Sequence, residues 1–226
     1  MKVVVLDRSG PGADVDAHGT GDDVTYLVGD VTSVDDVCNA VETAAAIGPL
    51  RVVVNTAGVG QPTLVLDGED PRLSLARCQE LIEVNLVGTL QVLFVAARAM
   101  AANEPCGADA ERGVFLAVAS TAAYDGSAGT VAYSASKAGI VGTVLPAARE
   151  LGPAGIRVCG IAPGPFDTPM HGQRRSPEKL REISQHVVYP GRAGHAAEFA
   201  ALVLHMVNNP YVNGTVIRLD AGERAQ

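Results

Sequence analysis

The sequence lacks tryptophan and is poor in aromatic residues, in charge and in cysteine. Aromatic residues make up 4% of the 226 residues and charged residues 19%, and the formal net charge is −8. Because no long basic run interrupts this acidic balance, nucleic acid is not expected as the main partner. The cysteines form no CxxC pair and have no companion histidine cluster, so we expect neither a metal site nor a disulfide framework. They are Cys38, Cys78, Cys106 and Cys159.

Long hydrophobic runs are missing too. The longest apolar helical stretch, near residues 86–102, is interrupted by Arg98, so no membrane partner is expected. Met1 and Lys2 are followed by only four strand-like residues, which predicts no signal peptide. Unpaired thiols fit a reducing compartment, so we expect a soluble cytoplasmic protein. Length and apolar content suit a single α/β domain over residues 1–226, large enough to bury a sizeable core.

Short apolar runs alternate with longer helical patterns along the chain. The predicted strands cover residues 3–6, 24–28, 51–54, 113–119, 156–161 and 216–219. The predicted helices cover about 34–46, with Ser33 as N-cap, then 74–103, 133–151, 177–185 and 196–208. Strands that alternate with helices predict an α/β fold with a parallel sheet covered on both faces.

Tyr133 and Lys137 lie four residues apart near the start of a predicted helix, so their side chains share one helix face. An ammonium group beside a phenol favours the phenolate, which would let Tyr133 act as a general base. Ser120 follows the apolar run 113–119 and should lie at the carboxyl end of a buried strand, where ligands bind in open α/β sheets. Alone, a tyrosine with a lysine one turn later is ordinary helix surface. The expected convergence of all three side chains favours a catalytic site.

These motifs resemble those of the short-chain dehydrogenase/reductase family over nearly the whole chain. The residues that carry the resemblance are 112–114, 132–142, 155–158, 161–164 and 213–220. The resemblance implies a Rossmann-like doubly wound parallel sheet and hydride transfer between NAD and a secondary alcohol or ketone. Within the family the likeness is strongest to dehydrogenases of 3-hydroxyacyl-CoA, so a 3-hydroxyacyl-CoA or similar small molecule is the expected substrate. Family members commonly form tetramers, which implies a homo-oligomer.

The same resemblance gives each candidate catalytic residue a role. Tyr133 would be the general base, and Lys137 would lower the Tyr133 pKa and hold the nicotinamide ribose. Ser120 would hydrogen-bond the substrate oxygen. Asn85 matches the family asparagine, whose helix backbone holds a proton-relay water. The segment 166–189 is expected to form a lid over the substrate.

The resemblance also distributes cofactor contacts along the chain. Asp7, at the end of the first predicted strand, would hydrogen-bond the adenosine ribose and repel a 2′-phosphate, which favours NAD over NADP; a turn aspartate is the alternative. Asp30 and Val31 would contact the adenine. The other expected cofactor contacts are Asn55, Thr56, Ala57 and Gly58 along the cleft, and Pro163, Gly164, Phe166 and Thr168 around the nicotinamide.

One part of the family pattern is missing from this sequence. The family places a Gly-rich phosphate-binding turn between its first strand and an aspartate like Asp7, but only six residues precede Asp7 here. We therefore expect an N-terminally truncated fold without the first strand and helix. Residues 1–60 would form an incomplete dinucleotide-binding half, and 61–226 the catalytic and substrate part. Residues 10–12 are no substitute, because the acidic residues after them would repel a pyrophosphate.

Loss of a central strand has a structural and a functional consequence. Strands 3–6 and 51–54 would each lose a ladder partner unless they pair with each other. A relative without a phosphate loop could also be a non-catalytic oligomerisation or binding module. This alternative stays open beside the oxidoreductase.

Overall fold

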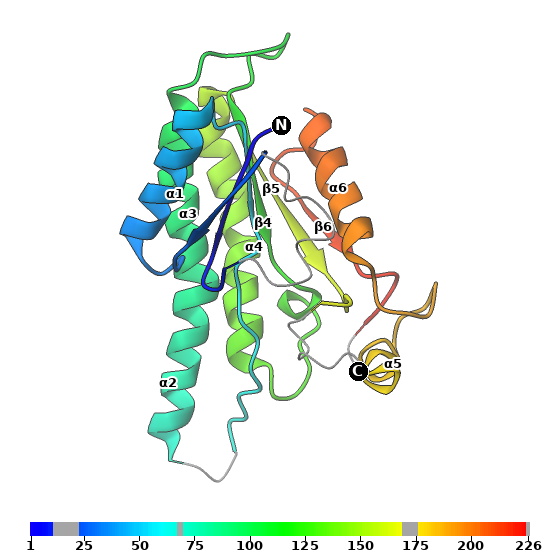
Figure 1. The fold of residues 1–226 in the computed structure, drawn as a ribbon. Helices are drawn as coiled ribbons and strands as arrows, with labels where there is room; N and C mark the ends of the chain where they lie inside the picture. Colours follow the sequence, from blue (N-terminus) through cyan, green and yellow to red (C-terminus); the bar gives the residue numbers. More distant parts are fainter. Residues whose placement is uncertain (11–22, 67–69, 169–175, 225–226) are drawn as a thin grey trace.

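The computed structural model describes residues 1–10, 23–66, 70–168 and 176–224, and its strands form two sheets (Figure 1). All pairings between these strands are parallel, as predicted. The smaller sheet pairs β1 (Val3–Asp7) with β2 (Val24–Val28). The larger sheet has the order β3 (Val52–Asn55), β4 (Gly113–Val118), β5 (Ile156–Pro163), β6 (Val216–Leu219).

Helices cover both faces of the larger sheet. Successive side chains of a strand point to opposite faces, so Phe115 packs against α3 and α4, whereas Leu116 packs against α6. In β5 the same alternation places Val158 on the α3–α4 face and Ile161 on the α6 face. The helices are α1 (Val34–Ile47), α2 (Pro71–Ile82), α3 (Gly88–Ala101), α4 (Val131–Leu151), α5 (Pro177–Ile183) and α6 (Ala196–Asn208).

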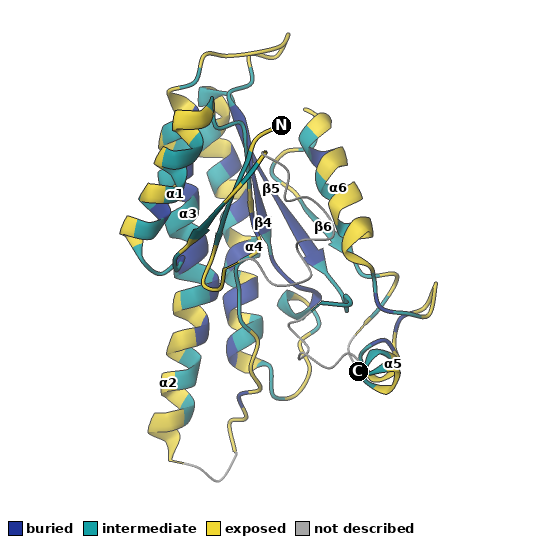
Figure 2. Cartoon of the chain, viewed as in Figure 1, coloured by how far each residue is buried: buried dark blue, intermediate teal, exposed yellow. Residues whose placement is uncertain are grey.

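The two sheets differ in burial (Figure 2). Every residue of β4 except Val118, and every residue of β5 except Pro163, is buried. No residue of β1 or β2 is buried. β1 and β3 do not pair with each other, so each has one ladder partner in the described part of the chain. The Rossmann-like topology is therefore present as two separate parallel sheets.

Most predicted elements are found within a few residues of their predicted bounds. Strands 24–28 and 216–219 and helix 196–208 have the predicted bounds. Ser33 caps α1, where its Oγ accepts a hydrogen bond from the Asp36 N–H at 3.2 Å. The helix predicted over 74–103 is found as one helical run, Pro71–Ala101, in which a π-helical turn, η1 (Glu83–Val87), separates α2 from α3.

The helical run Pro71–Ala101 is long and apolar enough to cross a membrane by length and composition. One such helix is weak evidence, because the core helices of soluble proteins pass the same test. Within the fold its α2 part packs against α4 and its α3 part against α1. The helical run therefore packs against other helices of the same domain.

Candidate active site

The structure brings Ser120, Tyr133 and Lys137 together at the carboxyl end of β4. Ser120 caps the short 3₁₀ turn η2 (Thr121–Ala123), where its Oγ accepts a hydrogen bond from the Ala122 N–H at 3.1 Å. Tyr133 lies in the first turn of α4, within hydrogen-bonding reach of the Ser120 side chain. Lys137 follows one turn later, and its Nζ lies 5.8 Å from the centre of the Tyr133 ring.

The charged side chain of Lys137 is buried inside the protein. The residue is 3% exposed, and its Nζ donates a hydrogen bond to the Val118 carbonyl at 2.9 Å, its one hydrogen bond within the described part of the chain. Burial lowers the Lys137 pKa to about 8, because the charged form loses its hydration. An ammonium has three N–H donors, so two are left for a ligand.

The Tyr133 phenol has a pKa above its ordinary value. Burial raises this pKa, and hydrogen bonding with the Ser120 side chain opposes part of the rise. Lys137 makes no contribution to this shift, since its ammonium donates to the Val118 carbonyl, and the lowering of the Tyr133 pKa by Lys137 stays a prediction. In this state Tyr133 carries its proton at neutral pH.

Asn85 joins the loop after β3 to α4. It is fully buried within the π-helical turn η1, a type of turn that is frequent at functional sites. Its Nδ2 donates to the Val59 carbonyl at 2.9 Å, and its Oδ1 accepts from the Val59 N–H at 2.8 Å. The same Nδ2 donates to Ser136 Oγ at 3.0 Å, and Ser136 Oγ donates to the Tyr133 carbonyl at 2.7 Å. The Asn85 side chain thereby fixes the loop against the helix that carries Tyr133.

Two members of this network, Ser136 and Thr89, were not singled out from the sequence. Thr89 Oγ1 donates to the Asn85 carbonyl at 2.6 Å and accepts from Asn55 Nδ2 at 2.8 Å. The carbonyl assigned to a proton-relay water thus already accepts one hydrogen bond, which leaves one lone pair for a water. The four-residue spacing from Asn85 to Thr89 was the available signal, since a threonine hydroxyl reaches the carbonyl one turn earlier. Ser136 gave a similar signal, three residues after Tyr133.

Glycines let the loop after β3 approach Tyr133 and Lys137 closely. A Cβ on Gly58 would lie 3.2 Å from both Lys137 Nζ and Asn85 Oδ1, and a Cβ on Gly60 would lie 3.7 Å from the Tyr133 ring. Thr56 is exposed and Ala57 is partly buried in the same segment. Free donors on a buried ammonium beside a closely approaching backbone fit ribose hydroxyl groups. The residues present therefore fit the nicotinamide-ribose part of a dinucleotide.

The predicted adenine-side residues lie at the carboxyl ends of β1 and β2. Asp7 is exposed, and its Oδ1 accepts a hydrogen bond from the Ser9 N–H at 2.8 Å, so it serves a local turn. Asp30 Oδ1 accepts from the N–H and the hydroxyl of Thr32, both at 2.9 Å, and the N–H bond is the main reason that the Asp30 pKa is lowered. The Val31 side chain is buried and packs against Gly88, so it is not free to contact an adenine.

The predicted nicotinamide segment follows β5. The Gly164 N–H donates to the Leu219 carbonyl at 3.0 Å, which fixes the turn after Pro163. The Phe166 ring meets Phe199 of α6 edge to face, with the ring centres 6.0 Å apart. Its side chain therefore packs away from Lys137, and only its backbone is left for a cofactor. Thr168, partly buried, is the last described residue before 169–175; that part of the predicted lid, like residues 11 and 12 of the rejected phosphate segment, lies outside the described residues.

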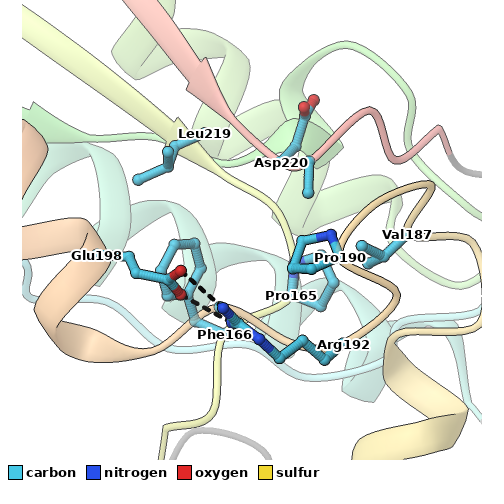
Figure 3. A pocket seen from close by; sticks show the side chains of 10 residues that line it. Pro165, Phe166, Val187, Pro190, Arg192, Glu198, Leu219 and Asp220 are labelled. Carbon is cyan, nitrogen blue, oxygen red and sulfur yellow. Dashed lines mark hydrogen bonds and ion pairs between the residues drawn. The ribbon is translucent and has the colours of Figure 1, made fainter.

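Phe166 instead lines a small apolar cavity of about 100 Å³ between α6, the end of the predicted lid and the C-terminal strand (Figure 3). An ion pair borders this cavity, because Arg192 Nη2 lies 2.8 Å from Glu198 Oε1 and Arg192 Nη1 lies 2.9 Å from Oε2. The cavity lies on the Phe199 side of the segment after β5. None of Ser120, Tyr133 and Lys137 lines it.

Comparison with known proteins identifies the family. The family profile described as enoyl-(acyl carrier protein) reductase matches residues 1–223. The 3-hydroxyacyl-CoA dehydrogenase type-2 of Drosophila melanogaster is 43% identical over 211 residues, which are 92% of this chain and 82% of that protein. The human protein of the same name is 41% identical over 226 residues, which are 99% of this chain and 85% of that protein.

Comparison with a solved structure identifies the same family. The crystal structure of 3-hydroxyacyl-CoA dehydrogenase type-2 from Mycobacterium avium matches with a TM-score of 0.85 and 34% identity, covering 100% of this chain and 87% of that one. A family profile and relatives that each span most of the chain agree with the geometry of Ser120, Tyr133 and Lys137. The chain belongs to the short-chain dehydrogenase/reductase family of oxidoreductases.

Proposed function

We propose that this protein transfers a hydride between NAD and a secondary alcohol or its ketone, with Tyr133 as the acid–base residue. The observation that carries the proposal is the juxtaposition of Ser120, Tyr133 and a buried Lys137 ammonium beside Gly58 and Gly60. A buried ammonium with two uncommitted donors is costly unless a ligand uses them, which supports a binding role for Lys137.

The chain's own groups account for the proton transfer and for binding of the substrate oxygen. Ser120 Oγ donates a hydrogen bond to that oxygen and stabilises the charge that develops on it. As the phenolate, Tyr133 Oη takes the alcohol proton during oxidation; as the phenol, it gives its proton to the carbonyl oxygen during reduction. Bound NAD supplies the hydride acceptor. Because the Tyr133 pKa is raised, the reductive direction starts from the correct protonation state at neutral pH.

Lys137 and Asn85 support the proton transfer by binding the cofactor and by positioning Tyr133. Lys137 would hold the ribose hydroxyls of the cofactor through the two N–H donors that its bond to the Val118 carbonyl leaves free. Asn85 keeps the Val59 backbone and Ser136 in place, so the loop after β3 stays fixed relative to Tyr133. Asp7 carries a negative charge at the ribose end, which favours NAD over NADP.

The substrate class rests on the relatives. The proteins from Drosophila melanogaster, human and Mycobacterium avium are named 3-hydroxyacyl-CoA dehydrogenases, so we take a 3-hydroxyacyl-CoA ester as the first candidate substrate. For the assembly we propose a cytoplasmic homotetramer. Phe94 on α3 is 63% exposed and Leu145 on α4 is 44% exposed, and apolar side chains on these two long helices support pairing between copies.

The second candidate is a non-catalytic oligomerisation or binding module. One observation favours it: β1 and β3 lack a shared ladder, so the residues expected to hold the adenosine and the catalytic residues lie on separate sheets. Binding of NADH to the purified chain separates the two candidates.

The test is turnover of a 3-hydroxyacyl-CoA ester with NAD⁺, followed by the absorbance of NADH. The same assay with NADP⁺ and with the free 3-hydroxy acid measures cofactor and substrate preference. We expect NADH to bind, and NAD⁺ to be preferred by about tenfold or more, because Asp7 repels a 2′-phosphate. Failure to bind NADH would favour the non-catalytic candidate, and turnover of the free acid alone would exclude the CoA ester as the substrate.

A further inference from the structure

The C-terminal turn, defined here as residues 218–224, contacts three separate walls of the candidate site. The Leu219 carbonyl accepts from the Gly164 N–H, which belongs to the predicted nicotinamide segment. The Ala221 carbonyl accepts from the N–H groups of Val188 and Tyr189, at 3.2 and 3.4 Å, where the predicted lid segment returns after α5. The third contact is made by a side chain, Arg218.

Arg218 binds the loop between Ser120 and α4. Its Nη2 donates to Asp125 Oδ2 at 2.6 Å, and its guanidinium carbon lies 5.3 Å from the centre of the Tyr124 ring. Its Nε donates to Asp220 Oδ2 at 2.7 Å, which fixes the guanidinium plane from the turn side. The Arg218 side chain is 23% exposed and that of Asp125 is 27% exposed, so water screens this pair less than an ion pair on the open surface.

The loop held by Arg218 connects Ser120 to the helix that carries Tyr133. It starts at Ser120, includes η2, and ends at Thr130, the N-cap of α4, three residues before Tyr133. Within the loop, the N–H groups of Tyr124 and Asp125 both donate to the Thr121 carbonyl at 2.9 Å. The separation of Ser120 from Tyr133 therefore depends on how firmly Tyr124 and Asp125 are held.

We infer that Arg218 is a positioning residue: through Asp125 and Tyr124 it holds the loop that sets Ser120 against Tyr133, and so ties the catalytic loop to the C-terminal turn. The inference rests on the proposed function only for its effect on turnover. Two features distinguish Arg218 from a simple surface ion pair. It uses Nε and Nη2 on different carboxylates, and it stacks on an aromatic ring, a combination that lysine cannot reproduce.

Arg224 provides a matched control in the same cluster. Its Nη1 lies 3.0 Å from Asp220 Oδ2, and its Nε lies 3.8 Å from Asp125 Oδ2. It has the same charge as Arg218, but its side chain is 57% exposed. Replacing either arginine with methionine removes one positive charge from the cluster, whereas Arg218→Met also removes the short bond to Asp125.

The first experiment is hydrogen exchange of the full-length protein as Arg218→Met and as Arg224→Met. In Arg218→Met we expect the amides of Tyr124 and Asp125 to exchange about tenfold faster, while the amides of β4 and β5 exchange at the wild-type rate. Arg224→Met should leave the loop amides within about twofold of wild type. Unchanged loop exchange in Arg218→Met, or equal acceleration in both variants, would overturn the inference. This readout does not depend on enzyme activity, so it decides the inference even if the proposed function fails.

Kinetics then test the consequence for the site. Arg218→Met should lower kcat about tenfold relative to Arg224→Met, because a misplaced Ser120 affects the transition state more than binding. The dissociation constant of NADH should stay within about twofold, because Arg218 holds the Ser120 loop and not Lys137. Arg218→Lys should recover part of the lost kcat, since it keeps the charge near Asp125. A parallel loss of kcat and NADH binding would show general disorder of the site and would contradict a positioning role.

Discussion

The larger sheet and the β1–β2 pair carry different parts of the candidate site, and they are enclosed to very different degrees. In β4 and β5 almost every residue is buried, between α3 and α4 on one face and α6 on the other. In β1 and β2 no residue is buried, and Val28 is 70% exposed. The predicted catalytic residues lie beside the enclosed sheet, whereas Asp7 ends β1 and Asp30 follows β2 in the open one.

Because the two sheets differ in burial, we expect them to differ in local stability and in their part in the site. Buried strands with complete ladders open only when most of the domain unfolds, so the positions of Ser120 and Lys137 are fixed before any ligand binds. A pair of strands with one ladder and half-buried side chains opens at a smaller cost in free energy. We therefore expect catalytic geometry to come from the larger sheet, and a bound dinucleotide to stabilise the β1–β2 pair.

The largest expected effect comes from truncating a matched leucine in each sheet. Leu116→Ala in β4 removes a side chain that is fully buried, and should lower the free energy of unfolding by about 2–5 kcal/mol. Leu6→Ala in β1 removes a partly buried side chain and should cost about 1 kcal/mol. Urea unfolding of both variants measures the difference. Equal losses would contradict the contrast between the sheets.

A smaller effect is expected from the pH dependence of Lys137. Its pKa is lowered in the folded state from 10.5 to about 8, so the folded protein binds this proton more weakly than the unfolded chain does. This charge therefore destabilises the fold below pH 8, and the cost is relieved as the pH rises from about 8 to 10, by about 2–3 kcal/mol. Across this range the difference between the unfolding free energies of wild type and Lys137→Met should change by that amount.

Other groups also change the free energy of unfolding in this pH range, so wild type must be compared with the variant. Burial raises the pKa values of Tyr133 and Cys159, and the contributions of these two acids to stability fall as the pH rises past their unfolded pKa values. Those contributions are shared by wild type and Lys137→Met and cancel in the difference. Lys179→Met on α5 serves as the surface control. Parallel pH curves for wild type and Lys137→Met would show that the ammonium is hydrated in the folded protein.

The smallest expected effect comes from Ser136→Ala. The substitution removes the hydroxyl that accepts from Asn85 Nδ2 and donates to the Tyr133 carbonyl, and should cost about 1 kcal/mol of stability. Because the link between Asn85 and α4 is lost, kcat should fall about threefold to tenfold. Ser134→Ala, whose hydroxyl bonds Thr130 Oγ1 on the other side of the helix start, is the control. Equal kcat values for the two variants would show that Ser136 does not position Tyr133.

Local patterns were enough to predict much of this architecture. The apolar run 113–119 predicted both a buried strand and the place of Ser120, and a spacing of four placed Tyr133 and Lys137 on one helix face. The missing central strand predicted that strands 3–6 and 51–54 would each lose a ladder partner unless they paired with each other, and the structure shows that they do not pair. These features depend on neighbours in sequence or on strand order, which the chain displays directly.

Features that depend on distant contacts could not be predicted in this way. Arg218 and Asp125 are 93 residues apart, and no spacing rule connects them. The direction of the Phe166 ring depends on Phe199 in α6, and the raised pKa of Tyr133 depends on how deeply the fold buries it. The π-helical turn at Asn85 depends on the packing of the surrounding helices, since the apolar pattern is continuous through it.

The central claim is that Tyr133 performs the acid–base step on a frame already built by the larger sheet. Tyr133→Phe tests it most directly, because it removes one hydroxyl and keeps the ring that α4 holds. We expect turnover with NAD⁺ and a 3-hydroxyacyl-CoA ester to fall about 10²–10⁴-fold, while NADH binding and the unfolding midpoint stay near wild type. Turnover at the wild-type rate would show that Tyr133 is not the acid–base residue.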